Sequence, residues 1–215
     1  MVGHGQPSVN VSSEDERQQM SLLQRQLKTA TMTDPDLHHF QSIPWCAKLL
    51  ADPDFTISPT RSRSAKASTE DSFFAETLQT DKTIRACLSL FSNATPSSSG
   101  ASPQIQRVHT LISLGSGING YPNIAHGGAV ATLLDQVMAI LMEENNYNGS
   151  GKHVVTAYLN VKYRQPVATP GVVLLTAGYT KVVQRKQFMR ATIEDGKGTV
   201  YAEAEALFVE IRQKL

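Results

Sequence analysis

The chain has 215 residues, of which 40% are apolar, so it can form one domain with an extension and bury a sizeable core. This composition excludes a collagen, a coiled-coil rod and a wholly disordered chain. Twenty Lys and Arg stand against nineteen Asp and Glu, so the formal charge is +1 and the basic surplus typical of nucleic-acid binders is missing. The two cysteines, Cys46 and Cys87, form neither a disulfide framework nor a zinc motif, which favours a reducing compartment.

No segment of the sequence predicts a membrane span or a targeting signal. The first twenty residues lack the apolar region of a secretory signal and contain three acidic residues, in which transit peptides are usually poor. The longest apolar run, from Gly127 to Met142, is shorter than the about 18 residues of a span and contains Asp135. We therefore expect a cytoplasmic protein; a mitochondrial location is the alternative, for which no clear transit peptide is present.

The first seventy residues predict an N-terminal extension. The first thirteen residues are polar, and a capping box that begins at Ser13 predicts a helix after them. A second short helix is expected near Trp45 to Leu50, and the polar stretch 58–70 is typical of a linker. We therefore expect residues 1–70 to form a polar tail, a helical arm and a linker.

From Phe73 onward the pattern changes to strand-like runs separated by turn residues. The expected strands cover residues 73–80, 83–91, 104–115, 153–166, 171–183, 186–195 and 199–211, with a hairpin between the first two. Strands joined by short turns pair antiparallel, and one apolar helix from about Gly127 to Glu144 interrupts the series. We therefore predict an α+β fold in one domain over residues 71–215.

Alternation in two of these runs assigns side chains to the two faces of the sheet. In the run 153–166, one face carries Ala157, Leu159, Val161 and Tyr163, and the other carries Tyr158, Asn160 and Lys162. In the last run, Val200, Ala202, Ala204, Ala206 and Phe208 lie opposite Tyr201, Glu203 and Glu205.

The sequence contains no convincing motif for binding a nucleotide or a metal ion. Gly115, Gly117 and Gly120 match the spacing of a dinucleotide fingerprint, but Pro122 follows where the helix of that motif should be under way. The histidines before and after this region are scattered, without the spacing of metal ligands. The sequence therefore predicts no cofactor and no metal site.

The most informative segment runs from residue 123 to 142 and places His126, Gly127 and Gly128 before an apolar helix. Consecutive glycines at a helix start let another group approach the free backbone N–H groups, whose partial positive charge suits a developing oxyanion. Asp135 lies on the same helix, where an unpartnered charge is costly to bury. A helix cap and a surface aspartate would explain the same residues, so residue chemistry alone leaves both interpretations open.

The spacing within this helix bears on assembly. Asp135 lies eight residues after Gly127, which is about 12 Å along a helix axis. Both residues cannot reach one carbonyl carbon across that distance. If both act in one reaction, two copies of the chain must supply them, so we expect a dimer with shared sites.

The pattern His-Gly-Gly-Ala-x-Ala-Thr-x-x-Asp, from His126 to Asp135, resembles the hotdog-fold acyl-CoA thioesterases, especially the phenylacetate-degradation and thioesterase-superfamily-member types. The likeness continues through residues 156–166, the pair Arg185-Lys186 and residues 201–209, and it covers roughly residues 105–211. It implies a hotdog fold, in which an antiparallel sheet wraps around one long central apolar helix, here with a helical N-terminal extension. It also implies a thioester hydrolase.

The resemblance also implies roles for individual residues. Asp135 matches the catalytic carboxylate, which acts as a general base or as a nucleophile toward the thioester. Gly127 and Gly128 match the helix start that binds the thioester oxygen, and His126 matches the motif histidine, which we expect to orient the loop. Thr156 matches a hydroxyl position that holds the attacking water or the carboxylate.

Substrate contacts are predicted at both ends of the matched region. The phenylacetate type has an Asn six residues before the His; here that residue is Gly120, and the nearby Asn123 is our candidate for binding substrate. Lys181, Arg185 and Lys186 cluster on a turn between two late strands, where they are placed to meet the phosphates of coenzyme A. A solvated turn explains these three residues equally well.

The leading function is therefore hydrolysis of an acyl-CoA, or of an acyl group held by a carrier protein, by a homodimer or homotetramer without nucleic acid or a membrane span. One alternative is a hotdog enzyme of a biosynthetic pathway that releases or cyclises a polyketide-type intermediate. The other is a non-catalytic module that binds acyl groups or another protein.

Overall fold

The structure is a computed structural model that describes residues 34–93, 105–147 and 153–211. The expected polar tail and the helix after Ser13 lie outside the described residues. So does most of the polar loop before the third expected strand.

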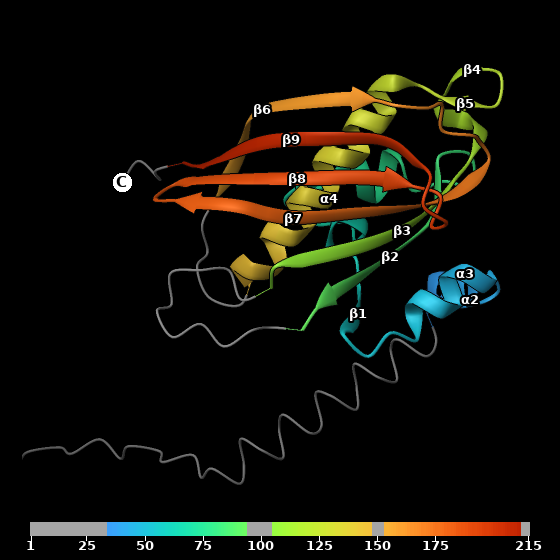
Figure 1. Cartoon of the computed structure of the whole chain (residues 1–215), viewed down its shortest axis with the longest axis horizontal. Coiled ribbons are helices and arrows are strands. Elements are labelled where there is room, and N and C mark those ends of the chain that lie inside the picture. The colour runs from blue at the N-terminus through green and yellow to red at the C-terminus, as the bar shows by residue number, and fades with distance from the viewer. Residues whose placement is uncertain (1–33, 94–104, 148–152, 212–215) are drawn as a thin grey trace, which may run out of the picture.

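Seven strands form one antiparallel sheet in the order β1-β2-β3-β7-β8-β9-β6 (Figure 1). The strands are β1 (Phe55–Pro59), β2 (Ile84–Ser92), β3 (Arg107–Leu114), β6 (Val154–Tyr163), β7 (Gly171–Val183), β8 (Lys186–Glu194) and β9 (Val200–Glu210). A separate hairpin of β4 (Asn119–Tyr121) and β5 (Ile124–Ala125) leads into the long helix α4 (Gly127–Tyr147). The predicted α+β architecture, with one long helix against an antiparallel sheet, is confirmed.

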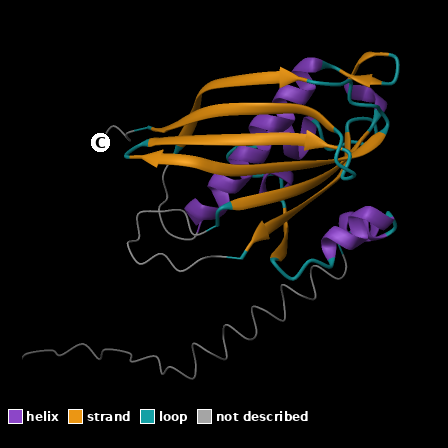
Figure 2. Cartoon of the chain, in the orientation of Figure 1, coloured by secondary structure: helices purple, strands orange, loops and turns teal. Residues whose placement is uncertain are grey.

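Helix α4 crosses one face of the sheet diagonally, and the strands curve around it (Figure 2). Its apolar side chains, among them Leu134, Met138 and Leu141, are buried against the sheet. Strand β9 faces the helix with a row of small residues, Ala202, Ala204 and Ala206, which lets the helix lie close to the strand. No helix among the described residues is long and apolar enough to cross a membrane.

Two short helices cover part of the opposite face of the sheet. They are α2 (Pro35–Gln41), which the Asp34 side chain caps, and α3 (Pro44–Leu50). Together with strands β2, β3 and β7 they form a second apolar core, whose buried members are Leu37, Phe40, Cys46, Ala86, Leu88, Leu90, Leu111 and Leu174. Strands β2 and β3 are therefore buried on both faces.

The structure differs from the sequence prediction around the expected linker. Phe55–Pro59 forms an edge strand, and Thr60 and Ser62, inside the stretch 58–70, are buried. The strand expected over 73–80 is wrong: Phe73–Thr77 forms a π-helical turn, so the predicted hairpin is absent as well. The neighbours Phe74 and Ala75 are both buried. In a strand covered on one face only, successive side chains point in opposite directions, so two neighbours would not both be buried.

The division of the chain at residue 70 stays a prediction. The structure shows that β1, which precedes this position, pairs with β2, which follows it. Trp45 of α3 also packs against the turn between β8 and β9, since a side chain added at Gly196 would meet its ring at 2.3 Å. Residues 34–59 are therefore built into the same folded body as the long helix.

Phe40→Ala is expected to destabilise the fold by about 3–5 kcal/mol, because Phe40 is fully buried between α2 and the sheet. In a chain of this size that loss lowers Tm by about 2–4 °C per kcal/mol. Thermal unfolding followed by circular dichroism measures it, with Phe73→Ala as the control, because Phe73 is 51% exposed. Equal Tm values for the two variants would show that α2 contributes little to the fold.

Candidate active site

The start of helix α4 is held by the histidine that precedes it. His126 Nδ1 accepts a hydrogen bond of 2.9 Å from the N–H of Gly128. The His126 N–H in turn donates to the carbonyl of Ile118, and its carbonyl accepts the first helical bond, from Val130. His126 thus caps the helix with its ring, which fits the predicted orienting role.

This cap determines which backbone donors remain free. The resemblance predicted oxygen binding by both glycines, but the N–H of Gly128 is taken by His126. Among the described residues, the N–H groups of Gly127 and Ala129 have no hydrogen-bond acceptor. The free donors at the positive end of the helix dipole are therefore those of Gly127 and Ala129.

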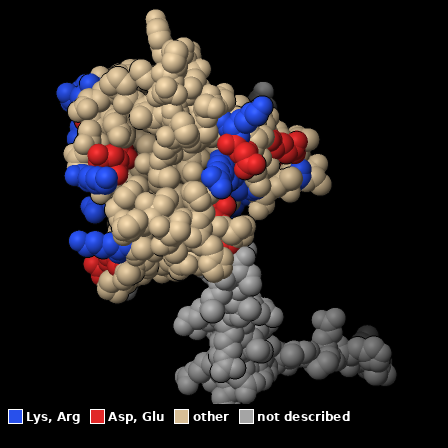
Figure 3. Space-filling model, turned by 90° about the vertical axis from the view of Figure 1, so that its right-hand side faces the viewer, with Lys and Arg blue, Asp and Glu red and all other residues tan. Residues whose placement is uncertain are grey.

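A cavity of about 320 Å³ lies beside this helix start. Its lining consists of Ile124, Ala125, Gly127, Val130, Tyr163 and residues 164–167. Most of these groups are apolar, and Gly127 brings the end of the helix to the wall. Figure 3 shows the end of the molecule that carries the β4–β5 hairpin, where charged side chains gather at the margins and a broad band between them has none.

Asp135 lies two turns further along α4 and has a partner on the neighbouring edge strand. Thr156 Oγ1 of β6 donates to Asp135 Oδ1 across 3.1 Å. Partial burial raises the pKa of Asp135 above its usual range, and the hydrogen bond from Thr156 offsets part of that rise. The site is thus a half-buried carboxylate held by one hydroxyl, which is an arrangement suited to a base.

A β-bulge brings Thr156 to this position. Thr156 pairs with Phe208 of β9 and Tyr158 pairs with Leu207, so Ala157 is the extra residue. The bulge reverses the alternation, and Thr156 therefore faces the helix together with Leu159. The sequence pattern placed Ala157 on one face with Leu159 by regular alternation. The bulge interrupts this alternation, because Ala157 is the extra residue.

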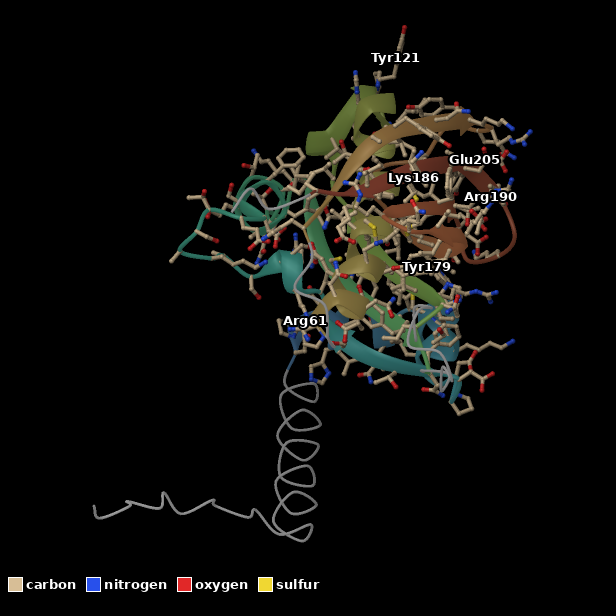
Figure 4. The ribbon with its side chains drawn as sticks, turned by 90° about the vertical axis from the view of Figure 1, so that its left-hand side faces the viewer. Arg61, Tyr121, Tyr179, Lys186, Arg190 and Glu205 are labelled. Atoms are coloured by element: carbon tan, nitrogen blue, oxygen red, sulfur yellow. The ribbon has the colours of Figure 1, made fainter. Side chains whose placement is uncertain are left out.

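The predicted substrate-binding residues lie at two distant places. Asn123 sits in the hairpin turn before the helix start, with a φ of 60°, and its carbonyl accepts from the N–H of Thr169. Lys181, Arg185 and Lys186 lie at the turn between β7 and β8 and are exposed. Lys186 is on the same sheet face as the Arg190–Glu205 ion pair, four residues before Arg190 along β8 and opposite α4 (Figure 4). Within one chain, the structure does not bring these two groups together.

Sequence reasoning singled out no role for Tyr163. Its hydroxyl donates to the carbonyl of Gly127 across 2.8 Å, so it touches the helix start directly. The sequence did offer one indication: Tyr163 lies seven residues after Thr156, within the same stretch that resembles the thioesterases.

Comparison with known proteins gives the same family as the motif. The Thioesterase superfamily model matches residues 122–202. The mouse (Mus musculus) acyl-coenzyme A thioesterase THEM4 is 31% identical over 107 residues, which are 49% of this chain and 44% of that protein. The chain thus spans less than half the length of this relative.

Two further proteins are similar over more of the chain. Verlamelin biosynthesis protein B of Lecanicillium sp is 27% identical over 202 residues, or 81% of this chain and 87% of that protein. The solved structure of the conserved protein PA5202 from Pseudomonas aeruginosa covers 71% of this chain and all of its own, at 16% identity and a TM-score of 0.48. The segment 122–202, which contains the helix start, Asp135 and Thr156, is thus similar to the thioesterase superfamily, and the antiparallel sheet around the long helix is a hotdog fold.

Proposed function

We propose that the protein hydrolyses acyl thioesters, with Asp135 activating water or attacking the carbonyl itself. The observation that carries this proposal is the hydrogen bond from Thr156 to a half-buried carboxylate in a thioesterase-superfamily segment. A raised pKa makes the carboxylate a better proton acceptor. Thr156 fixes which oxygen of Asp135 remains open to the water.

The negative charge that develops on the thioester oxygen needs donors, and the helix start supplies them. We assign this role first to the N–H of Gly127, because the Gly128 N–H is bonded to His126. A backbone donor fixed before the reaction stabilises the oxyanion without reorganisation, an effect worth about 2.7–4 kcal/mol for one donor in other hydrolases. His126 then acts by holding the helix start in place.

Two chains complete one site in this proposal. Gly127 and Asp135 are about 12 Å apart along α4, so the oxyanion donor of one chain would meet the carboxylate of its partner. Strand β6 is an edge of the sheet, so its unpaired backbone groups favour contact with a second copy. We therefore propose a two-fold symmetric dimer as the minimal active unit.

Acyl-CoA is the first substrate to test, because the THEM4 relative is named as an acyl-coenzyme A thioesterase. The test is release of free thiol from a panel of acyl-CoA esters that varies chain length and ring content. We expect turnover of at least one ester that depends on Asp135. No hydrolysis of any ester by a folded protein would contradict the proposal for acyl-CoA.

A second candidate is release of a carrier-bound acyl group in a biosynthetic pathway. The match to verlamelin biosynthesis protein B favours it, because this match extends over 81% of the chain and therefore reaches beyond the segment shared with THEM4. Assaying the same acyl group on coenzyme A and on a carrier protein separates the two candidates. A much higher kcat/KM for the carrier-bound ester would favour the second.

Thr156→Val is expected to lower kcat less than a change at Asp135 does. A hydrogen bond of this kind contributes about 0.5–1.5 kcal/mol, which corresponds to a loss of roughly two- to tenfold. The bond also lowers the pKa of Asp135, so without it that pKa rises and the acidic limb of the pH profile moves to higher pH. A Val variant with unchanged kcat/KM and an unchanged profile would show that Thr156 serves sheet packing alone.

A further inference from the structure

Tyr163 makes a contact that the proposed reaction has not yet used. It is the last residue of β6, and its hydroxyl donates to the carbonyl oxygen of Gly127 across 2.8 Å. The ring also lies against this glycine, since a side chain added at Gly127 would meet three atoms of Tyr163 at 3.6–3.7 Å. The tyrosine therefore contacts the first residue of α4 by a hydrogen bond and by packing.

The peptide group between Gly127 and Gly128 is held at both of its polar atoms. Tyr163 bonds to its carbonyl oxygen, and His126 Nδ1 bonds to its N–H. Because a peptide group is planar, fixing both atoms fixes the orientation of the whole group. Two consecutive glycines would otherwise give this helix start more conformational freedom than any other pair of residues.

The clamped peptide adjoins the peptide group that carries the free donor, between His126 and Gly127, whose carbonyl oxygen accepts from the N–H of Val130. The N–H of Gly127 lies one residue before the clamped group, and it has no acceptor among the described residues. A donor is useful to an oxyanion only when its direction is set before the charge develops. Val130 holds the peptide before Gly127 and Tyr163 holds the peptide after it, so Tyr163 is placed to help fix the direction of the donor without touching the reacting atoms.

The same strand also holds the second half of the site. Thr156 binds Asp135 near one end of β6, and Tyr163 binds Gly127 at the other end. We infer that Tyr163 is a positioning residue for thioester hydrolysis, which orients the oxyanion donor of Gly127 through its bond to the Gly127 carbonyl. This inference rests on the proposed function of the same site.

Tyr163→Phe removes the hydroxyl and keeps the ring, and Tyr158→Phe is the matched control. Tyr158 lies on the same strand with similar exposure, 47% against 56%, and its hydroxyl has no hydrogen bond among the described residues. We expect kcat of Tyr163→Phe to fall about tenfold, roughly the effect of one hydrogen bond, with KM within about twofold of the wild type. The acidic limb of its pH profile should stay in place, because the bond between Thr156 and Asp135 is untouched.

The outcomes separate positioning from other roles. A fall in kcat alone, with Tyr158→Phe at the wild-type level, supports the inference. A rise in KM without a change in kcat would show that Tyr163 only binds substrate in the adjoining cavity, and equal kcat values for the two variants would show no role; either result overturns it. If the wild type hydrolyses no thioester while Asp135→Asn is equally folded, the proposed function fails, and the inference fails with it.

Discussion

Replacing Asp135 by Asn is expected to lower kcat by at least about 100-fold, the usual scale for losing a general base. The amide has nearly the size of the carboxylate and still offers Thr156 an oxygen to bind, so the geometry of the pair is preserved. It cannot accept a proton from water or attack a carbonyl as an anion. The measurement is kcat at saturating acyl thioester, and near-wild-type turnover would contradict the assignment of Asp135.

The same variant should not be less stable than the wild type. The folded-state pKa of Asp135 lies above its unfolded value, so its ionisation lowers the stability of the fold as the pH rises from the unfolded pKa to the raised pKa, and the loss is complete above the raised pKa. This penalty disappears as the pH falls below the unfolded value, where both states are protonated. Asn carries no charge to desolvate, so Tm at pH 7–8 should equal or exceed that of the wild type. An inactive but stable variant separates loss of chemistry from loss of fold.

The pH profile gives an independent test of the same carboxylate. In the proposed reaction the ionised form of Asp135 is the active one, so hydrolysis should decline as the pH falls through its raised pKa. The midpoint of this acidic limb should lie above the usual value for aspartate, about 3.9. A limb at or below that value would show that the burial seen around Asp135 does not govern the reaction.

Much of the fold was predictable because its signals are local. The apolar helix, and all the expected strands from residue 83 onward, are present, since each has a clear period and is bounded by turn residues. Most errors lie before residue 83, and the short β4–β5 hairpin was also not predicted. Strand β1 and helix α2 are short and bury their apolar residues against other elements of the fold, as Phe40 does against β2 and β3. The sequence did contain a hint, because the continuous apolar run of β2 is typical of a strand buried on both faces.

The site required information that periodicity does not carry. Strict alternation would place Thr156 on the same face as Tyr158 and Asn160, away from the helix. Only the bulge at Ala157 turns it toward Asp135, and the resemblance, not the pattern, singled it out. Similarly, two glycines at a helix start look equivalent in sequence. The ring of His126 makes them different by taking the N–H of Gly128.

The shared-site dimer makes a prediction that no single-chain mechanism makes. Each chain would contribute Asp135 to one site and its helix start to the other. The helix start can be disabled with Gly128→Val, because a side chain there would lie 3.0 Å from His126 Nδ1 and displace the cap. A chain with Gly128→Val and a chain with Asp135→Asn should each be inactive as homodimers.

Heterodimers of these two chains should recover up to one working site in two. That site combines the intact helix start of the Asp135→Asn chain with the intact carboxylate of the Gly128→Val chain. Co-expression with two affinity tags isolates the heterodimer, and kcat per dimer should approach half the wild-type value. The matched control pairs the Asp135→Asn chain with a chain that carries both substitutions, which leaves no carboxylate and should stay inactive. No recovery in a confirmed heterodimer, or full turnover by a monomer in light scattering, would place Gly127 and Asp135 in separate roles.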